Sequence, residues 1–209
     1  MPGTVQTARP PSRSDRRRSE TRRRLLTAAR ELIAEKGVGA MRTGDITERA
    51  DVGAGSFYNH FADKGEIVGA LLAEIAEEQG AVVDELTREI EDPAAVVAYA
   101  HRHFVRLAAG DPAFGQLVIR LEASHGLMRK VLGPRATRDI NEGIRAGRFN
   151  VDDAVAATYA TGGTLLGTIA GVVDGTLGAG ADEPHAAAVL RMLGLGTEDA
   201  ATVSSLAMD

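Results

Sequence analysis

The sequence contains no cysteine and no tryptophan, and aromatic residues make up only 4% of its 209 residues. Without cysteine, neither a disulfide framework nor a thiolate metal site can form. A nucleophile elbow, a phosphate-binding glycine loop and a histidine pair at metal-ligand spacing are also missing from the sequence. We therefore expect a protein that is not an enzyme and that has no metal ion or cofactor.

No stretch alternates between polar and apolar residues in the way that predicts a half-buried strand. Apolar residues instead recur at helical spacing, which predicts an all-α fold. We expect helices at about residues 20–36, from Thr43, at 54–61 and 63–90, from Pro93 to Gly110, from Asp111-Pro112, at 154–173 and 184–193, and from Thr197. Gly133 and Pro134 interrupt the pattern between residues 125 and 147, so that segment should be less regular.

Residues 154–173 carry no charge, which makes a membrane-spanning helix an alternative to be tested. Alanine, glycine and threonine dominate the stretch, and the flanking Asp152, Asp153 and Asp174 provide no basic residue at either end. We expect a buried helix whose small residues allow another helix to approach closely. The chain also begins without the apolar region of a signal peptide, so we expect a cytoplasmic protein.

Charge is distributed unevenly along the chain, whose formal net charge is −5. Residues 1–64 carry 13 lysines and arginines against 8 acidic residues, whereas residues 65–209 carry 11 against 21. A basic first part joined to an acidic remainder is typical of a protein that presents only its first part to nucleic acid. Residues 1–19 have few apolar side chains and should form a disordered basic arm, either a solvated tail or a DNA contact.

Two short apolar stripes between residues 42 and 64 surround Asp51-Val52-Gly53, a stretch with the composition of a turn. Two short helices joined by such a turn, with residues 20–36 as a third helix to pack on, predict a helix-turn-helix unit. Aspartate tolerates the left-handed backbone that the turn needs, and Gly53 is an acceptable cap for the helix that follows.

The order of residues in this region also resembles a known family. The positions that carry the resemblance are Thr21-Arg22, Leu25-Leu26, Ala28-Ala29, Leu32-Ile33, Glu35-Lys36-Gly37, Thr43, Asp45-Ile46, Ala50, Val52, Gly55, Phe57-Tyr58, His60-Phe61 and Lys64. Together they resemble the tetracycline-repressor (TetR) family over about residues 20–72, although Asp51 and Gly53 stand where that family usually carries glycine and serine. The resemblance implies a DNA-binding domain over residues 20–64 and a helical ligand-binding and dimerisation domain over residues 65–209.

The predicted third helix exposes side chains that suit DNA recognition. Asparagine can bond adenine through two hydrogen bonds, and tyrosine and lysine suit phosphates. The candidate DNA-binding residues are Arg42, Thr43, Gly53, Ala54, Ser56, Tyr58, Asn59, His60 and Lys64. Two alternatives stay open, because Tyr58 could be partly buried in the core and His60 could be a structural histidine at the helix end.

The resemblance also implies a ligand cavity and a dimer interface in the acidic remainder. Candidate cavity residues are His103, Phe104, Leu107, Phe114, Val118, Leu121 and Tyr159, and for each of them ordinary core packing is the alternative. Candidate interface residues are Gly163, Gly167, Ala170, Gly171, Ala186, Val189, Leu190 and Leu193.

We therefore predict a homodimeric transcriptional regulator that acts as a repressor rather than as an activator. It should bind a palindromic double-stranded DNA operator and be released from it by a small-molecule effector. A non-specific, nucleoid-type DNA-binding protein is the main alternative. The acidic remainder of the chain and the exposed Asn59 argue against that alternative, and an enzyme is a more distant one.

Overall fold

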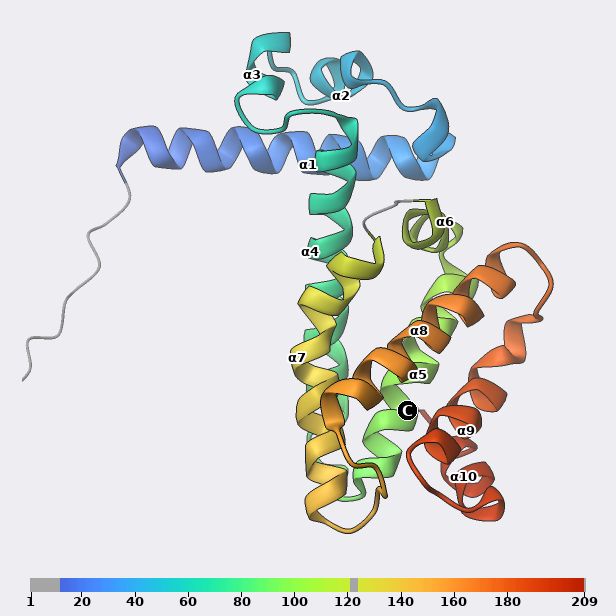
Figure 1. Ribbon diagram of the computed structural model, residues 1–209. Coiled ribbons are helices and arrows are strands. Elements are labelled where there is room, and N and C mark those ends of the chain that lie inside the picture. Colours follow the sequence, from blue (N-terminus) through green and yellow to red (C-terminus); the bar gives the residue numbers. More distant parts are fainter. Residues whose placement is uncertain (1–11, 121–123, 209) are drawn as a thin grey trace, which may run out of the picture. The chain divides into compact units, whose positions relative to one another are not determined.

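The computed structural model describes residues 12–120 and 124–208, and within these ranges it contains helices and no strand (Figure 1). The predicted all-α fold is confirmed. The helices are α1 (Arg13–Ala40), α2 (Thr43–Arg49), α3 (Ala54–Tyr58), α4 (Lys64–Leu86), α5 (Pro93–Gly110), α6 (Pro112–Arg120), α7 (Ser124–Arg145), α8 (Ala154–Val173), α9 (Asp182–Met192) and α10 (Thr197–Ser204), with a 3-10 turn at Ala179–Ala181. They form two compact units that meet in sequence between Ile67 and Val68, inside α4.

The first helix begins earlier than its apolar pattern predicts. Ser12 Oγ accepts a hydrogen bond from the Asp15 backbone N–H, and the Asp15 carboxylate accepts one from the Ser12 backbone N–H. This reciprocal cap starts α1 at Arg13, so the prediction of disorder is wrong for residues 13–19. Residues 1–11 lie outside the described ranges. Gly37, with φ of 75°, interrupts the helical backbone where the sequence predicts the helix to end.

The helix-turn-helix forms as its turn chemistry predicts. Asp51 has φ of 49°, the left-handed conformation expected of it, and Gly53 is the cap residue of α3. The helix α2 begins at Thr43 as predicted, and the Asp45 carboxylate accepts a hydrogen bond from the Arg42 backbone N–H just before it. One prediction is wrong in detail, because α3 ends at Tyr58 rather than at residue 61.

Side chains buried between α1, α2 and α3 hold the first unit together. They come from α1, from the segment before α2, from α2 and α3, and from the segment after α3: Leu25, Ala29, Leu32, Met41, Ile46, Phe57 and Phe61. Because short helices are marginal in water on their own, α2 and α3 depend on this packing.

In the second unit, α5 is the central helix. It packs against α7, α8 and α9, and α7 packs against α8 (Figure 1). Arg102 Nε and Arg106 Nε of α5 both donate to Asp182 Oδ2 of α9, at 3.1 and 2.6 Å. The helix α5 begins at Pro93 as the sequence predicts, and Asp92 caps it. Asp111 is at the start of α6, also as predicted, and accepts a hydrogen bond from the Ala113 backbone N–H.

The predicted interruption at Gly133 and Pro134 is absent, because α7 runs through both residues as one helix. Proline removes one backbone hydrogen bond from a helix, a local cost that packing can offset. Here Ile140 is buried in the core, and Thr137 Oγ1 lies 2.9 Å from Thr158 Oγ1 of α8. Tertiary contacts therefore keep α7 continuous.

The uncharged helix α8 is less buried than predicted. Its buried residues are Ala154, Thr158, Thr161, Leu165 and Ile169, which form one face. Among the described helices, α8 has the length and composition of a membrane span, and 22% of its apolar window is buried. Because this face packs on α5, α6 and α7, α8 belongs to the helical body, and its other face is open.

Half of the predicted interface residues lie elsewhere. Ala186, Val189, Leu190 and Leu193 are 0% exposed within a single chain, where they belong to the core that α9 forms with α5 and α10. A side chain that is fully buried in its own chain cannot contact a partner, so these four predictions are wrong. Gly163 and Gly167 are exposed on α8, and Ala170 and Gly171 are half-buried.

Candidate nucleic-acid interface and ligand cavity

The helix α3 buries one side and exposes the other. Phe57 is completely buried, whereas Ala54, Tyr58 and Asn59 are exposed and Ser56 is half-buried. The Tyr58 side chain is 62% exposed and contacts Phe57 edge-on, with 5.4 Å between the ring centres. Tyr58 is therefore not the partly buried core residue of the alternative interpretation.

The backbone at the start of α3 is not covered by side chains from elsewhere in the chain. No atom lies within 4 Å of where a Cβ would stand at Gly53 or at Gly55. At the start of α2, Arg42 is exposed and Thr43 is half-buried. These positions leave the predicted DNA contacts accessible, with one exception.

The exception is Lys64, whose ammonium group is engaged inside the first unit. Its Nζ donates to the backbone carbonyls of Val38 and Met41, both at 3.1 Å. These bonds hold the end of α1 and the residue after it against the first residue of α4. No local pattern in the sequence indicates this structural role, because it depends on a contact across more than twenty residues.

A cationic hollow beside the helix-turn-helix was also missed. Arg18, Ser19 and Arg22 of α1 line it together with Asp15 and His60. Burial, and then the positive charges of Arg18 and Arg22, lower the pKa of His60. Arg18 and Arg22 are four residues apart and therefore share one face of a helix, which is a signal that the sequence contains. The predicted disordered arm, residues 1–19, includes Arg18 and hides that signal.

The second unit contains a partly open cavity of about 250 Å³ between α4, α5, α7 and α8, and the lining residues Tyr159 and Gly163 are exposed. Its apolar wall consists of Val83, Phe104, Met128, Leu132, Leu165 and Leu166. Its polar wall includes Asp84, His101, Arg129, Arg135, Asp139, Thr158, Tyr159 and Thr161. An apolar chamber with a few polar groups is typical of a site for a small organic ligand.

Two of the predicted cavity residues, Phe104 and Tyr159, line this chamber. The other described ones do not: His103, whose Nε2 lies 2.8 Å from Gln79 Oε1, Leu107, Phe114 and Val118. Leu121 lies outside the described residues. Phe114 and Val118 are buried in the core, so the alternative of ordinary core packing holds for them.

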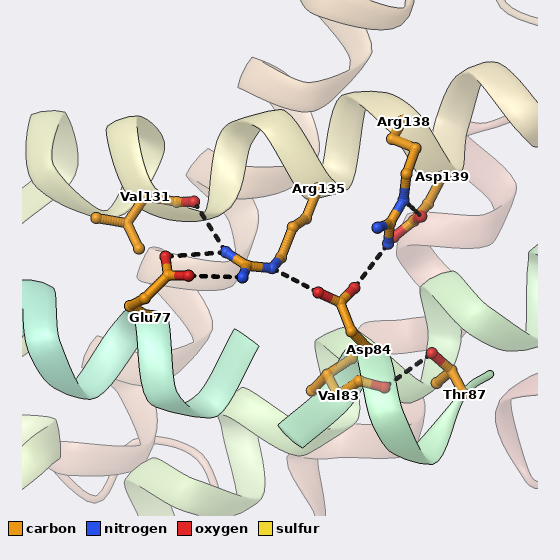
Figure 2. A network of polar contacts seen from close by, with 8 residues as sticks. All are labelled: Glu77, Val83, Asp84, Thr87, Val131, Arg135, Arg138 and Asp139. Carbon is orange, nitrogen blue, oxygen red and sulfur yellow. Dashed lines mark hydrogen bonds and ion pairs between the residues drawn. The ribbon is translucent and has the colours of Figure 1, made fainter. Parts of the chain in front are cut away.

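An ion-pair network joins α4 to α7 at the cavity wall (Figure 2). Arg135 donates hydrogen bonds to the carboxylates of Glu77 and Asp84, each at 2.7 Å. Arg138 donates to the other oxygen of Asp84 and to Asp139, also at 2.7 Å. Burial disfavours the Asp84 carboxylate, but the bonds from Arg138 and Arg135 outweigh it and lower its pKa. Burial raises the pKa of Asp139 despite its bond to Arg138.

A buried histidine pair lies behind another part of the wall. His101 Nδ1 of α5 is 2.9 Å from His185 Nε2 of α9, and His185 Nδ1 is 2.9 Å from Thr168 Oγ1 of α8. Burial lowers the pKa of His101 to about 3 and that of His185 to about 4, so both rings are neutral at pH 7. Within the described ranges, no group of three histidine, aspartate or glutamate side chains could hold a metal ion.

Comparisons with known proteins match both units. Residues 25–71 match the family model of the bacterial regulatory proteins of the tetR family, and residues 92–206 match that of the tetracyclin repressor-like C-terminal domain. The crystal structure of RolR in complex with its ligand resorcinol is similar over 93% of this chain and 97% of that chain. The sequence identity is 36% and the TM-score is 0.86.

Two sequence relatives match the first unit. The HTH-type transcriptional repressor Rv3405c of Mycobacterium tuberculosis is 39% identical over 64 residues, 28% of this chain. The uncharacterized HTH-type transcriptional regulator YvkB of Bacillus subtilis is 32% identical over 65 residues, 31% of this chain. Each alignment spans 34% of the length of these relatives. With both family models matched in sequence order and RolR similar over almost the whole chain, the protein belongs to the tetR family of bacterial regulatory proteins.

Proposed function

We propose that this protein is a homodimeric repressor that acts in the cytoplasm and reads a palindromic operator with α3. It leaves the operator when a single-ring phenol occupies the cavity. The observation that carries this proposal is the pairing of an exposed recognition helix with a largely apolar, partly open cavity in one chain. A non-specific DNA-binding protein would not need the second of these features.

For the DNA-binding half, we assign base reading to Asn59 and Ser56, with Ala54 and Gly53 allowing the backbone close to the groove. Arg42, Thr43 and Tyr58 contact phosphates. Arginine is suited to phosphate because its planar group donates two parallel hydrogen bonds. The hollow lined by Arg18, Arg22 and His60 therefore extends the phosphate-contacting surface onto α1.

For the ligand-binding half, the cavity indicates a small molecule. A volume of about 250 Å³ lies below that of typical pockets for drug-sized ligands, so one aromatic ring suits it better than two. RolR, which is similar over almost the whole chain, was crystallised with resorcinol. Asp139 and Thr158 offer hydrogen-bond acceptors for ligand hydroxyls, while Phe104, Leu132 and Leu165 offer apolar contact.

We assign the link between ligand and DNA to α4. Its later residues Val83 and Asp84 line the cavity, and its first residue, Lys64, holds two backbone carbonyls next to the helix-turn-helix. A ligand that binds the DNA-incompetent arrangement more tightly than the competent one would shift the balance between the two arrangements.

Selection of duplexes from a random pool, followed by titration with resorcinol, tests the proposal. We expect recovery of a palindromic sequence and a loss of affinity for it of about 5- to 150-fold at saturating resorcinol. Recovery of unrelated sequences with equal affinity would overturn the DNA-binding half. If a palindrome is recovered but no dihydroxybenzene changes the protein's affinity for it, only the proposed ligand would be overturned.

A further inference from the structure

A chain of hydrogen bonds leads from the cavity to a helix face beyond it. His101 lines the cavity and is 8% exposed. Its Nδ1 is bonded to His185, and His185 is bonded in turn to Thr168, a residue of α8 that does not line the cavity. The chain therefore connects the cavity wall with α9 and α8.

The two histidines share one choice of proton positions. A neutral imidazole carries one N–H and one acceptor nitrogen, so a bond between two neutral rings sets both tautomers together. If Thr168 donates its hydroxyl to His185 Nδ1, then His185 Nε2–H donates to His101 Nδ1. His101 then carries its proton on Nε2. If Thr168 accepts instead, every proton is reversed and His101 Nε2 becomes an acceptor.

The surroundings of Thr168 favour the first arrangement. Thr158, Thr161 and Thr164 of the same helix donate their hydroxyls to backbone carbonyls in the preceding turn. The hydrogen bond that the structure gives for Thr168 Oγ1 runs to His185 instead. A threonine hydroxyl has one proton to donate, and the imidazole is the acceptor within reach. These contacts favour a Thr168 hydroxyl that donates to His185 Nδ1.

The last nitrogen of the chain, His101 Nε2, is free to bind a ligand. Among the described residues it has no hydrogen-bond partner, and no fully buried side-chain nitrogen or oxygen lacks one. His101 Nε2 is therefore not fully buried, and the cavity that His101 lines is where a ligand oxygen could reach it.

We propose that the His101 Nε2–H is the donor by which the cavity recognises an acceptor oxygen of its aromatic ligand, and that Thr168 sets this donor through His185. His101 is thus a ligand-binding residue, while His185 and Thr168 are positioning residues. The proposal rests on the proposed function in taking the cavity as the effector site. It adds a rule for ligand specificity: the aromatic ring of the ligand must carry an oxygen that accepts a hydrogen bond from His101.

The ligand-free protein tests the chain first. Nitrogen-15 NMR of histidine-labelled protein distinguishes Nε2–H from Nδ1–H rings, and we expect both His101 and His185 in the Nε2–H form. Assignment uses His101→Phe and His185→Phe. Finding either ring in the Nδ1–H form would overturn the proposal, and this outcome does not depend on which ligand the cavity takes.

Binding of resorcinol, measured by calorimetry, tests the positioning role. Thr168→Val has nearly the same shape but no hydroxyl, and we expect it to bind resorcinol about 2- to 10-fold more weakly, the effect of one hydrogen bond. Thr168→Ser should restore the affinity. His103→Phe, which alters a neighbouring α5 histidine outside the cavity, is the matched control and should change nothing. Equal resorcinol affinity of Thr168→Val and the unchanged protein would refute the proposal.

Failure of the unchanged protein to bind resorcinol would instead refute the ligand named under the proposed function. The NMR measurement of the histidine tautomers would then still test the hydrogen-bond chain.

Discussion

At the scale of single residues, neighbours on α3 have opposite roles. Phe57 is completely buried and anchors the helix, whereas Tyr58 and Asn59 project outward. A helix of five residues keeps this orientation only because its anchor is packed. Lys64 has a comparable anchoring role through the carbonyls of Val38 and Met41. For this reason Arg42 is a better residue than Lys64 with which to test phosphate contacts.

We expect Asn59→Ala and Arg42→Ala to weaken DNA binding in different ways. Asn59→Ala should relax the base preference at one position per half-site, costing about 1–3 kcal/mol against the preferred base. Arg42→Ala should weaken all sequences alike and reduce the slope of log affinity against log salt by about 0.9 per half-site. Affinities for a panel of single-base variants at several salt concentrations measure both effects. Identical sequence profiles for the two variants would contradict the division into reading and positioning.

The buried histidines should make the protein sensitive to acid. Their pKa values fall from an ordinary 6.5 to about 3 for His101 and about 4 for His185, so the unfolded chain takes up protons first as the pH falls. The stability they provide is therefore complete above about pH 6.5 and declines below it. The slope is at most about 1.4 kcal/mol per pH unit for each ring.

Urea unfolding between pH 7.5 and 5 measures this decline. The double variant His101→Phe/His185→Phe should lose less of its free energy of unfolding over that range than the unchanged protein. The ion-paired carboxylates titrate equally in both proteins, so the difference isolates the histidines. Parallel curves would show that the two rings do not control the response to acid.

At the scale of elements, α8 has two unlike faces. One packs on α5, α6 and α7, and the other exposes Val155, Tyr159, Gly163 and Gly167. An exposed apolar helix face is typical of a surface that another chain covers. Small residues there allow a second helix to approach closely. We therefore place the proposed dimer contact on this face of α8 and not on the buried face of α9.

Gly167→Phe tests this contact without disturbing the single chain. A Cβ at Gly167 would meet no atom within 4 Å, whereas one at Gly171 would stand 2.8 Å from Leu177. We expect Gly167→Phe to separate the two chains and to weaken operator binding, because two recognition helices must be held roughly 34–36 Å apart, or a multiple of that, to read a palindrome. Gly167→Ala is the matched control and should remain dimeric. Sedimentation showing an intact Gly167→Phe dimer would remove this face from the interface.

At the scale of the whole molecule, the proposed switch has a thermodynamic consequence. If resorcinol lowers operator affinity by some factor, the operator must lower resorcinol affinity by the same factor. We expect calorimetric titrations with and without the selected duplex to differ by about 5- to 150-fold. Equal resorcinol affinities in the two titrations would mean that the cavity and the DNA-binding unit are independent.

Features that depend on neighbouring residues can be predicted from the sequence. The all-α fold, the left-handed Asp51, the cap at Gly53 and the starts of α5 and α6 all follow from periodicity, turn chemistry and capping. These signals lie within a few residues of the structure they specify. The same local order of residues carried the resemblance to the family.

Which residues lie close together in space depends on how the helices pack. Phe104 and Tyr159 both line the cavity, but most of its wall comes from α7 and α8 residues that no local pattern singled out. Likewise, α9 residues at helical spacing show that one face is buried, but not whether its own chain or a partner buries it. The continuity of α7 through Pro134 also depends on contacts with α8. Such contacts join residues far apart in the chain, so their energies outweigh local preferences without leaving a local signature.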